Sequence, residues 1–347
     1  MAEPFNRIRI RERRGTMLWF RAPEKVYFKK GSMPVALDEL GTVLNKKKAF
    51  IITDSFLYKN GNIKPVEEKL DTAKIQHIAF FNAQPTLAAV REGAAQIRLF
   101  EPDVIIALGG GSVIDAAKAI WVLYEHPEAD FEDLAKRFSD IRKREEQFPK
   151  LGAKAYFVAI PTSSGTGSEV TPYSVITDEE KQVQYTVADY ELLPNMAIVD
   201  ADYSMNQPKE LTGKSGIVAL AHAILAYAGQ QATEYTDGFA LNAAKDIFDY
   251  LPSAYENGAD DPTAREKMAN ASAMAGIAFA NVAYEEVNAS DITNIIKANA
   301  ESDKNAFERY VECAKFLGFI GSDKNDTFDR LIAAIEELQN QCGIVKD

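Results

Sequence analysis

The sequence is poor in the residues that build disulfides and soft metal sites. Its 347 residues include only two cysteines and three histidines. Cys313 and Cys342 form no CxxC pair, which excludes a disulfide framework and a zinc ribbon. The histidines, His77, His126 and His222, are far apart in the sequence, so a site built from several imidazoles has few side chains to use.

Long hydrophobic runs are also absent. The longest, such as residues 104–108 and 157–160, are as long as strands and fall short of the roughly 20 residues that a membrane span needs. No charged start followed by an apolar stretch and a small-residue cleavage site is present, so we expect no secretory signal. The expectation is therefore a cytoplasmic protein with no membrane partner.

Positive charge is in the minority. Lysine and arginine number 39 against 51 aspartate and glutamate, a net charge of −12. This excess disfavours nucleic acid as a partner, because phosphate binding needs concentrated positive charge. The exception is residues 7–14, where arginines alternate with Ile8, Ile10 and Glu12. We interpret residues 1–24 as a solvated linker or a docking edge strand, and an anion site is the less favoured alternative.

Two kinds of pattern follow in the chain. Residues 25–205 alternate strand-like runs, expected at 49–53, 75–80, 104–107, 155–160 and 196–199, with helical stretches such as 87–99 and 113–124. This alternation predicts a Rossmann-like α/β domain, whose parallel sheet places ligands at the carboxyl ends of its strands. Residues 206–347 predict an all-α domain, with helices near 216–231, 237–250, 264–283, 291–300, 304–317 and 326–342.

Three consecutive glycines follow the strand expected at residues 104–107. Gly109, Gly110 and Gly111 lead through Ser112 into a helix with Asp115 in its first turn. Residues without side chains let backbone N–H groups approach a phosphate, and the helix N-terminus favours negative charge. The loop therefore predicts a diphosphate cradle, although a bare GGGS is also found in flexible turns.

A second polar loop follows the strand expected at residues 155–160. It is rich in hydroxyl groups, suited to a sugar, a diphosphate or a nicotinamide amide, and we name Thr162, Ser163, Thr166 and Ser168 as cofactor-binding candidates. Asp54 ends the first strong strand. Its carboxylate can accept hydrogen bonds from a ribose 2′-hydroxyl and repel a 2′-phosphate, which favours NAD over NADP, but such residues also cap helices.

These three segments together resemble the iron-containing, or group III, alcohol dehydrogenases. The resemblance is closer to the C-terminal half of bifunctional aldehyde-alcohol dehydrogenases and covers residues 17–281, resuming from Asn288. It rests on MLWF at 17–20, VYF at 26–28, GGGSVIDAAK at 109–118, YEHPE at 124–128, RF at 137–138, DIRKR at 140–144, SGTGSEVTP at 164–172 and ADY at 188–190.

The resemblance implies a fold like that of dehydroquinate synthase and NAD-linked interconversion of short aldehydes and primary alcohols. In the family a divalent metal, usually iron, polarises the alcohol oxygen. The resemblance also implies a homo-oligomer, often with filament-type contacts, and makes the basic segment before Met17 a linker.

The chain departs from this family at the metal ligands. The family presents an aspartate and a histidine as D-x-x-x-H on one helix, but here Val218 precedes His222, and Leu225 replaces an expected acidic residue. Two further histidines should follow residues 275–281, where the chain instead continues VAYEEV. One imidazole cannot hold a catalytic ion, so we expect NAD without bound iron, and no metal ligands.

A smaller departure affects the cofactor side. Gln184 stands where the family usually has a lysine, and this change should weaken cofactor binding without abolishing it.

Two functional hypotheses remain open. The first is an oxidoreductase that is inactive or weak in its family reaction, with His222 as a weak proton acceptor. The second is a nucleotide-binding or filament-assembly module without catalysis. A sugar-phosphate cyclase needs the same missing ligands and is set aside.

Overall fold

Within residues 19–135, 148–282 and 288–344, which the computed structural model describes, six strands form one parallel sheet. In the order β1-β8-β5-β4-β2-β3, all neighbours pair in parallel. Five of these strands lie where the sequence predicts them, and only the short β1 was missed. Their bounds are β1 (Lys25–Phe28), β2 (Lys48–Ile52), β3 (Gln76–Phe80), β4 (Val104–Gly109), β5 (Tyr156–Pro161) and β8 (Met196–Val199).

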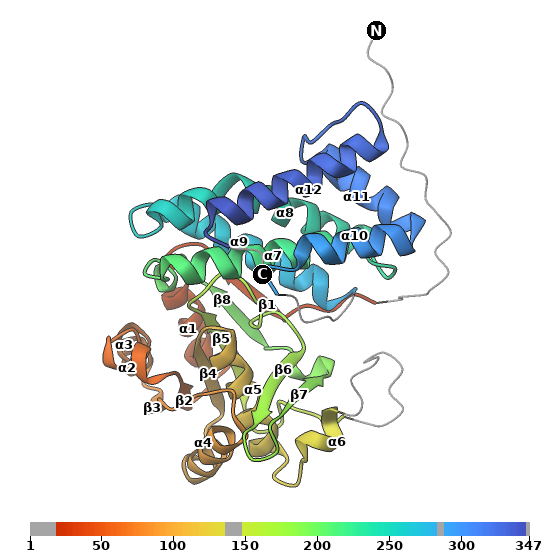
Figure 1. The fold of residues 1–347 in the computed structure, drawn as a ribbon. Helices are drawn as coiled ribbons and strands as arrows, with labels where there is room; N and C mark the ends of the chain where they lie inside the picture. The colour runs from red at the N-terminus through yellow and green to blue at the C-terminus, as the bar shows by residue number, and fades with distance from the viewer. Residues whose placement is uncertain (1–18, 136–147, 283–287, 345–347) are drawn as a thin grey trace.

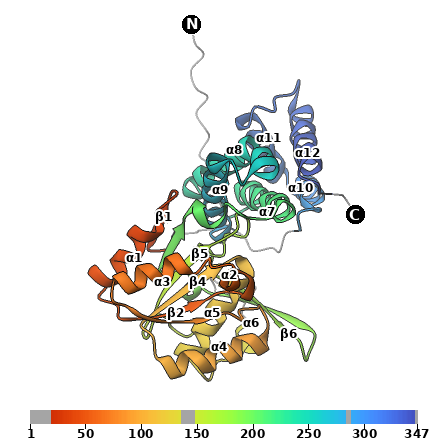
Figure 2. The same ribbon diagram turned by 90° about the vertical axis from the view of Figure 1, so that its left-hand side faces the viewer.

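Helices cover both faces of this sheet, as Figures 1 and 2 show. Alternate strand residues point to opposite faces, so Phe50 and Ile105 pack with α4 (Leu87–Phe100) and α5 (Gly111–Glu125). Their neighbours Ile51 and Ile106 pack with α1 (Met33–Thr42) and α3 (Lys64–Thr72) on the other face. Every strand residue of β4 is buried, as expected for a parallel sheet between two helical layers. The predicted doubly covered sheet is confirmed.

An antiparallel hairpin was not predicted. It consists of β6 (Tyr173–Asp178) and β7 (Val183–Ala188), paired from Tyr173 with Ala188 to Asp178 with Val183. In β6 the sequence YSVITD breaks the alternation at Val175-Ile176, whereas β7, VQYTVA, alternates regularly and was overlooked. The hairpin lies against α5 and beside the short α6 (Phe131–Ala135) (Figure 1).

The second half of the chain is helical, as predicted. Its helices are α7 (Lys209–Ala228), α8 (Glu234–Asn257), α9 (Pro262–Ala280), α10 (Ile292–Ser302), α11 (Lys304–Phe316) and α12 (Lys324–Gln341). The expected start of the first helix at residue 216 was wrong, because the helix begins seven residues earlier at Lys209, immediately after Pro208. By length and composition α7 could cross a membrane, but 78% of its most apolar window is buried inside the protein, as in a core helix.

The helical domain rests on the carboxyl edge of the sheet through the loop between β5 and β6. Gly167 of this loop has φ +67°, and a Cβ there would lie 2.9 Å from Cα of Gly276 in α9. Only a glycine pair permits this approach. Phe20 stacks on Phe239 of α8, so residues 19–22 also contact the helical domain; the rest of the predicted linker, residues 1–18, lies outside the described residues.

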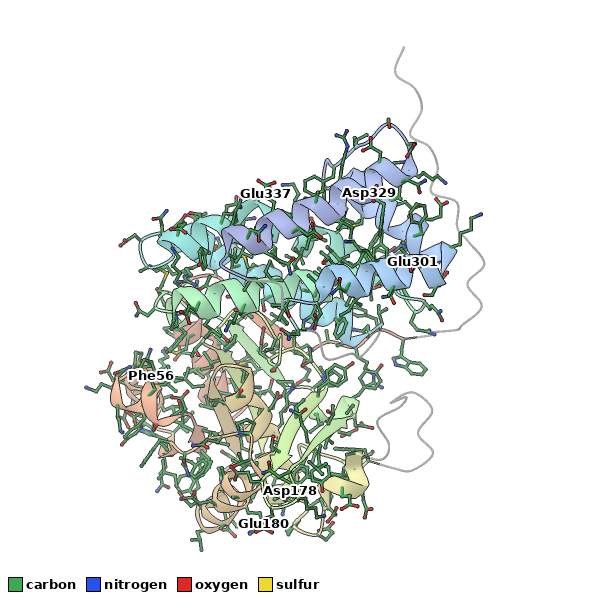
Figure 3. All side chains as sticks on the ribbon, in the orientation of Figure 1. Phe56, Asp178, Glu180, Glu301, Asp329 and Glu337 are labelled. Atoms are coloured by element: carbon green, nitrogen blue, oxygen red, sulfur yellow. The ribbon has the colours of Figure 1, made fainter. Side chains whose placement is uncertain are left out.

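Negative charge is displayed on the outer surface of the helical domain. Glu301 of α10 and both Asp329 and Glu337 of α12 are exposed, and Figure 3 shows them on the outer side of their helices.

Candidate functional site

The pairing of three neighbouring strands brings the predicted loops together. Ile52 of β2 is in register with Ala107 of β4, and Gly109 of β4 is in register with Pro161 of β5. The residues that follow these positions leave the same edge of the sheet side by side. The strand order reverses between β2 and β4, and parallel sheets bind ligands at such a switch point.

The triple-glycine loop forms the N-terminus of α5. Gly110 is the N-cap and offers no capping side chain, so the free N–H groups of the first helical turn remain for a ligand. Gly110 and Gly111 are partly exposed and Ser112 is exposed. A Cβ on Gly109 would lie 2.5 Å from Cβ of Val113, which lets the helix pack directly on its own strand. This geometry fits a diphosphate.

The second polar loop faces these glycines. A Cβ on Gly110 would lie 3.3 Å from Oγ of Ser163, and one on Gly111 would lie 2.6 Å from Oγ1 of Thr166. Thr162 starts the loop by donating its N–H to the Gly109 carbonyl at 3.0 Å. The structure therefore brings Gly109, Gly110, Gly111, Ser112, Thr162, Ser163 and Thr166 to one place, and their role as cofactor-binding residues stays a prediction.

The helical domain holds the polar loop in position. The N–H of Ser164 donates to Oε1 of Gln207 at 3.1 Å, and Nε2 of Gln207 donates to Ser215 of α7. The N–H of Gly165 donates to Oγ of Ser272 in α9 at 2.6 Å. Sequence reasoning missed Gln207 and Ser272, because they are 43 and 107 residues from the groups they bind and belong to no motif.

Asp54 makes the alternative interaction that the sequence left open. It is the N-cap of the short α2 (Ser55–Lys59), and its Oδ1 accepts the N–H of Leu57 at 2.8 Å. A capping carboxylate uses one oxygen for this bond, so the second oxygen of the partly exposed Asp54 can still accept a hydrogen bond from a ligand.

Asp115 and Ser168 are engaged within the protein. The Asp115 carboxylate accepts the N–H of Val175 at 3.2 Å, and Oγ of Ser168 lies 3.1 Å from Oγ1 of Thr166. Burial raises the pKa of Asp115 to about 6, which the nearby Lys118 partly offsets. Ser168 is therefore buried behind Thr166, whereas Asp115 is partly exposed at the first turn of α5.

Two further charged groups are buried beside Asp115. Lys118 is fully buried and donates to the carbonyls of Thr171 at 2.6 Å and Tyr173 at 2.9 Å, and burial lowers its pKa to about 8. Glu169 is 2% exposed, and burial raises its pKa to about 7. The loop is thus underlain by groups that change charge near neutral pH.

His222 lies in an apolar setting on α7. Its ring stacks on Phe279 of α9, with centroids 4.4 Å apart. Its Nδ1 is buried without a hydrogen-bond partner among the described residues, and burial lowers its pKa to about 4. Ser215 and His222 are seven residues apart on α7, and Ser272 and Phe279 are seven residues apart on α9. Seven residues are about two helical turns, so the two residues of each pair lie on the same helix face, about 10 Å apart along the axis. The polar loop is therefore bound at Ser215 and Ser272, and His222 contacts Phe279 two turns further along the same two helices.

These surroundings do not fit a divalent metal. Val218, one turn before His222, is partly buried against the apolar core, and Leu225 belongs to that core. Across residues 19–135, 148–282 and 288–344, no three His, Cys, Asp or Glu side chains lie close enough to hold an ion. His77 lies in β3 and His126 ends α5, where its Nε2 contacts the carbonyl of Lys150 at 2.7 Å.

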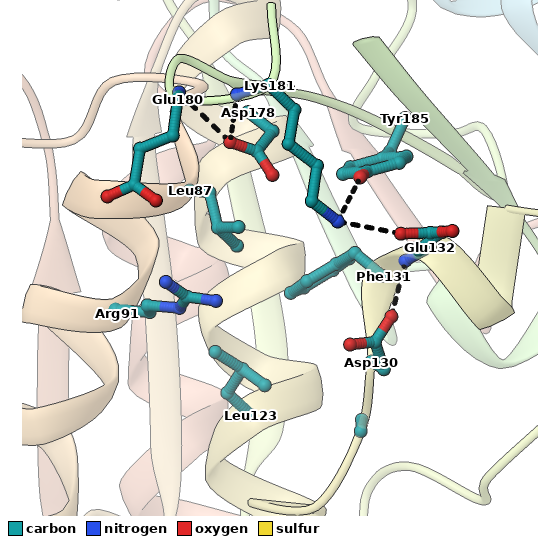
Figure 4. A pocket seen from close by; sticks show the side chains of 11 residues that line it. Leu87, Arg91, Leu123, Asp130, Phe131, Glu132, Asp178, Glu180, Lys181 and Tyr185 are labelled. Atoms are coloured by element: carbon teal, nitrogen blue, oxygen red, sulfur yellow. Dashed lines mark hydrogen bonds and ion pairs between the residues drawn. The ribbon is translucent and has the colours of Figure 1, made fainter. Parts of the chain in front are cut away.

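A separate cavity of about 130 Å³ lies between α4, α5, α6 and the turn of the hairpin (Figure 4). Lys181 crosses one side of it and donates to Glu132 at 2.7 Å and to Tyr185 at 3.4 Å. Asp178 accepts the N–H groups of Glu180 and Lys181. None of the ten residues predicted to bind the cofactor lines this cavity.

Two family models match the chain. The model described as iron-containing alcohol dehydrogenase matches residues 23–201, and the model for the C-terminal part of the Fe-containing alcohol dehydrogenase family matches residues 212–289. The chain is 43% identical over 98% of its length to the bifunctional aldehyde-alcohol dehydrogenase AdhE of Escherichia coli K12, of which the match covers 42%. It thus spans less than half of that relative and matches its alcohol dehydrogenase region.

Relatives of similar length and solved structures agree. The NADPH-dependent butanol dehydrogenase of Clostridium saccharobutylicum is 35% identical over 94% of this chain and 85% of its own. An iron-containing alcohol dehydrogenase from Thermococcus thioreducens superposes with a TM-score of 0.83 at 28% identity, covering 94% of this chain and 86% of its own. A 1,3-propanediol oxidoreductase superposes equally well, at 29% identity over 95% and 88%. By sequence and by fold, this chain belongs to the iron-containing alcohol dehydrogenase family.

Proposed function

We propose that this chain binds NAD(H) between its triple-glycine loop and its second polar loop, and that it interconverts short aldehydes and primary alcohols weakly or not at all. The observation that carries the proposal is the setting of His222. His222 is stacked on Phe279 with no carboxylate one turn away, so a metal would have too few protein ligands there, and its lowered pKa makes it a poor base at neutral pH.

Several features support the nucleotide part. Gly110 and Gly111 leave the N-terminus of α5 open toward Ser163 and Thr166, which suits a diphosphate flanked by sugar hydroxyls. A sulfoacetaldehyde reductase of similar fold was solved in complex with NAD⁺. The free oxygen of Asp54 favours NAD over NADP, because it repels a 2′-phosphate.

The comparison with AdhE supports the loss of activity. The match extends over 375 residues, more than the 347 of this chain, so the relative has residues there that this chain lacks. The sequence places such a gap directly after Asn281, where the remaining family ligands are expected. Val218 and Leu225 then avoid burying carboxylates that no metal would neutralise.

The test is NADH binding by fluorescence or calorimetry, with and without added Fe²⁺, followed by acetaldehyde in the same cell. The proposal expects binding that does not change with metal, and NADH oxidation that is absent or slow. Oxidation that depends on Fe²⁺ or Zn²⁺ would overturn the proposed loss of the metal site, and absence of NADH binding would overturn the nucleotide part. If slow oxidation of NADH is found, the reverse reaction, ethanol with NAD⁺, tests His222: His222→Ala should reduce that rate, because His222 is the proposed weak proton acceptor for the alcohol.

A further inference from the structure

A buried arginine in the helical domain carries a charge that no carboxylate neutralises within the described residues. Arg265, near the beginning of α9, is 4% exposed, and burial lowers its pKa. Burial of an unpaired charge is costly, and an arginine stays charged in proteins. Other groups must therefore hold its guanidinium, and their positions show what Arg265 does.

The guanidinium lies at the end of α8. Gly258 is the C-cap of that helix, and a Cβ on Gly258 would lie 2.3 Å from Nη2 of Arg265. The last carbonyls of a helix have no partner within the helix and carry partial negative charge, which favours a cation there. The glycine leaves the space that the guanidinium occupies, so the end of α8 takes the place of a carboxylate.

The two terminal nitrogens of Arg265 donate to the segment that leads into α7. Nη1 donates to Oγ1 of Thr212 at 2.8 Å, and Nη2 donates to the main-chain carbonyl of Gln207 at 2.8 Å. Nε is buried without a partner among the described residues, so these two bonds set the direction of the planar group. Thr212 also donates to the Pro208 carbonyl at 3.0 Å, which closes the turn that Arg265 binds.

Gln207 connects this turn to the second polar loop. Its Oε1 accepts the N–H of Ser164 at 3.1 Å, and its Nε2 donates to Oγ of Ser215 at 2.9 Å. Its own N–H donates to the Ser204 carbonyl at 3.1 Å, and its carbonyl is the one that Arg265 binds. Every polar group of Gln207 therefore has a partner, and its side chain, 6% exposed, holds the loop in one position.

From this path of hydrogen bonds, and given the proposed NAD(H) site, we propose that Arg265 is a positioning residue for the cofactor. Arg265 fixes Gln207, and Gln207 fixes the N–H of Ser164. The residue before Ser164 is Ser163, whose Oγ would lie 3.3 Å from a Cβ on Gly110. The path thus sets the distance between the polar loop and the triple-glycine loop. A cofactor that contacts both loops binds best at that distance.

The experiment measures the Kd of NADH by calorimetry and the melting temperature of each variant. Arg265→Met keeps the apolar part of the side chain and removes its donors, and it should weaken NADH binding about tenfold, the size of one lost buried hydrogen bond. Arg265→Lys keeps the charge at the end of α8 but reaches only one of the two acceptors. It should therefore restore part of the affinity, to a loss of about threefold.

Gln339→Met is the matched control. Gln339 of α12 is 1% exposed and donates to the Ala289 carbonyl at 2.6 Å, so the variant also removes a buried hydrogen bond of the helical domain. This bond takes no part in the path to Ser164. Gln339→Met should lower the melting temperature, as Arg265→Met does, but should bind NADH within about twofold of the wild type.

A double-mutant cycle tests whether Arg265 acts through Gln207. Gln207→Met removes the hydrogen bond to Ser164 and should weaken NADH binding about tenfold. Adding Arg265→Met should then cause no further loss, because the path is already interrupted. Losses that multiply in the double variant would show that Arg265 acts by another route, and would overturn the proposed path.

Thr212→Val decides the question if Arg265→Met fails to fold. It keeps the shape of the side chain and removes one of the two acceptors of Arg265, so NADH affinity should fall about threefold. Wild-type affinity in Arg265→Met or in Thr212→Val, or an equal loss of affinity in Gln339→Met, would overturn the positioning role. Failure of the wild type to bind NADH would overturn the proposed function itself, and is therefore a distinct result.

Discussion

Replacing His222 by leucine removes a buried imidazole whose charge differs between the folded and the unfolded protein. In the folded chain, burial lowers the pKa of His222 to about 4, against an ordinary value of 6.5. The unfolded chain therefore binds one proton more than the folded chain between pH 4 and 6.5. Stability must rise with pH through this window, and the contribution of His222 is neutral above pH 6.5.

The size of the effect follows from the shift in pKa. Each unit is worth about 1.4 kcal/mol, so the wild type should lose about 2 to 3 kcal/mol of unfolding free energy between pH 7.5 and 4.5 through His222 alone. His222→Leu removes this dependence. Leucine also changes the packing on Phe279, but that change is the same at every pH. The difference between the two proteins should therefore shift by about 2 to 3 kcal/mol in favour of the variant as the pH falls.

Urea unfolding at pH 7.5 and 4.5 measures this difference. A constant difference at both pH values would show that His222 is hydrated or paired in the folded state, and would refute the apolar setting inferred for it. The same titration with Fe²⁺ or Zn²⁺ at pH 7.5 adds a second check. A ligand at 100 times its Kd stabilises by about 2.7 kcal/mol, so a metal-dependent gain that His222→Leu abolishes would contradict the proposed loss of the metal site.

Three further predictions concern the cofactor loops. Gly111→Ala places a Cβ 2.6 Å from Oγ1 of Thr166, so calorimetry should show NADH affinity reduced about tenfold or more, with little change in melting temperature. Asp54→Ala removes the N-cap of α2 and the free carboxylate oxygen; it should cost about 1 kcal/mol in urea unfolding and reduce the ratio of NADH to NADPH affinity. Glu169→Gln should have a higher melting temperature than the wild type at pH 8.5 but not at pH 5.5. The raised pKa of Glu169, about 7, means that its stabilising proton is lost as the pH rises; an equal advantage at both pH values would refute this.

The order of strands and helices was predictable because the buried strands are continuous apolar runs. All six residues of β4 are buried. A continuous apolar run of this length fits a central strand of a parallel sheet whose two faces are both covered by helices. The hairpin was not predictable in the same way. Seven of its twelve strand residues are buried, and they pack against α5 and α6 rather than inside the parallel sheet, a placement that a sequence pattern does not encode.

The part of the candidate site that could be predicted is the part formed by a single continuous segment of the sequence. The triple-glycine loop needs only its strand and its helix, and both are adjacent in the sequence. The anchors of the second loop, Gln207 and Ser272, come from other elements and have common side chains, so they acquire their role only through the fold. Asp115 shows the intermediate case, because the motif indicated its importance, and the structure shows that its carboxylate accepts the N–H of Val175 in the unpredicted hairpin.

Under the proposed loss of the metal site, the region around His222 is still needed to support the polar loop. Ser215 supports the polar loop through Gln207, and Ser272 supports it directly. Ser215 lies on the same face of α7 as His222, two turns away. Ser272 lies on the same face of α9 as Phe279, also two turns away. If α7 and α9 separated after losing a metal, the polar loop would lose its support and the proposed nucleotide site with it. Val218 packs on the apolar core of the helical domain, and the stacking of His222 on Phe279 joins α7 to α9. Restoring the carboxylate alone, by Val218→Asp, should therefore weaken NADH binding rather than revive chemistry, because it places an unneutralised charge in the contact on which the polar loop depends. Calorimetry of this variant beside Val218→Asn, which has the same shape without the charge, checks this reasoning: equal NADH affinity in the two variants would contradict it.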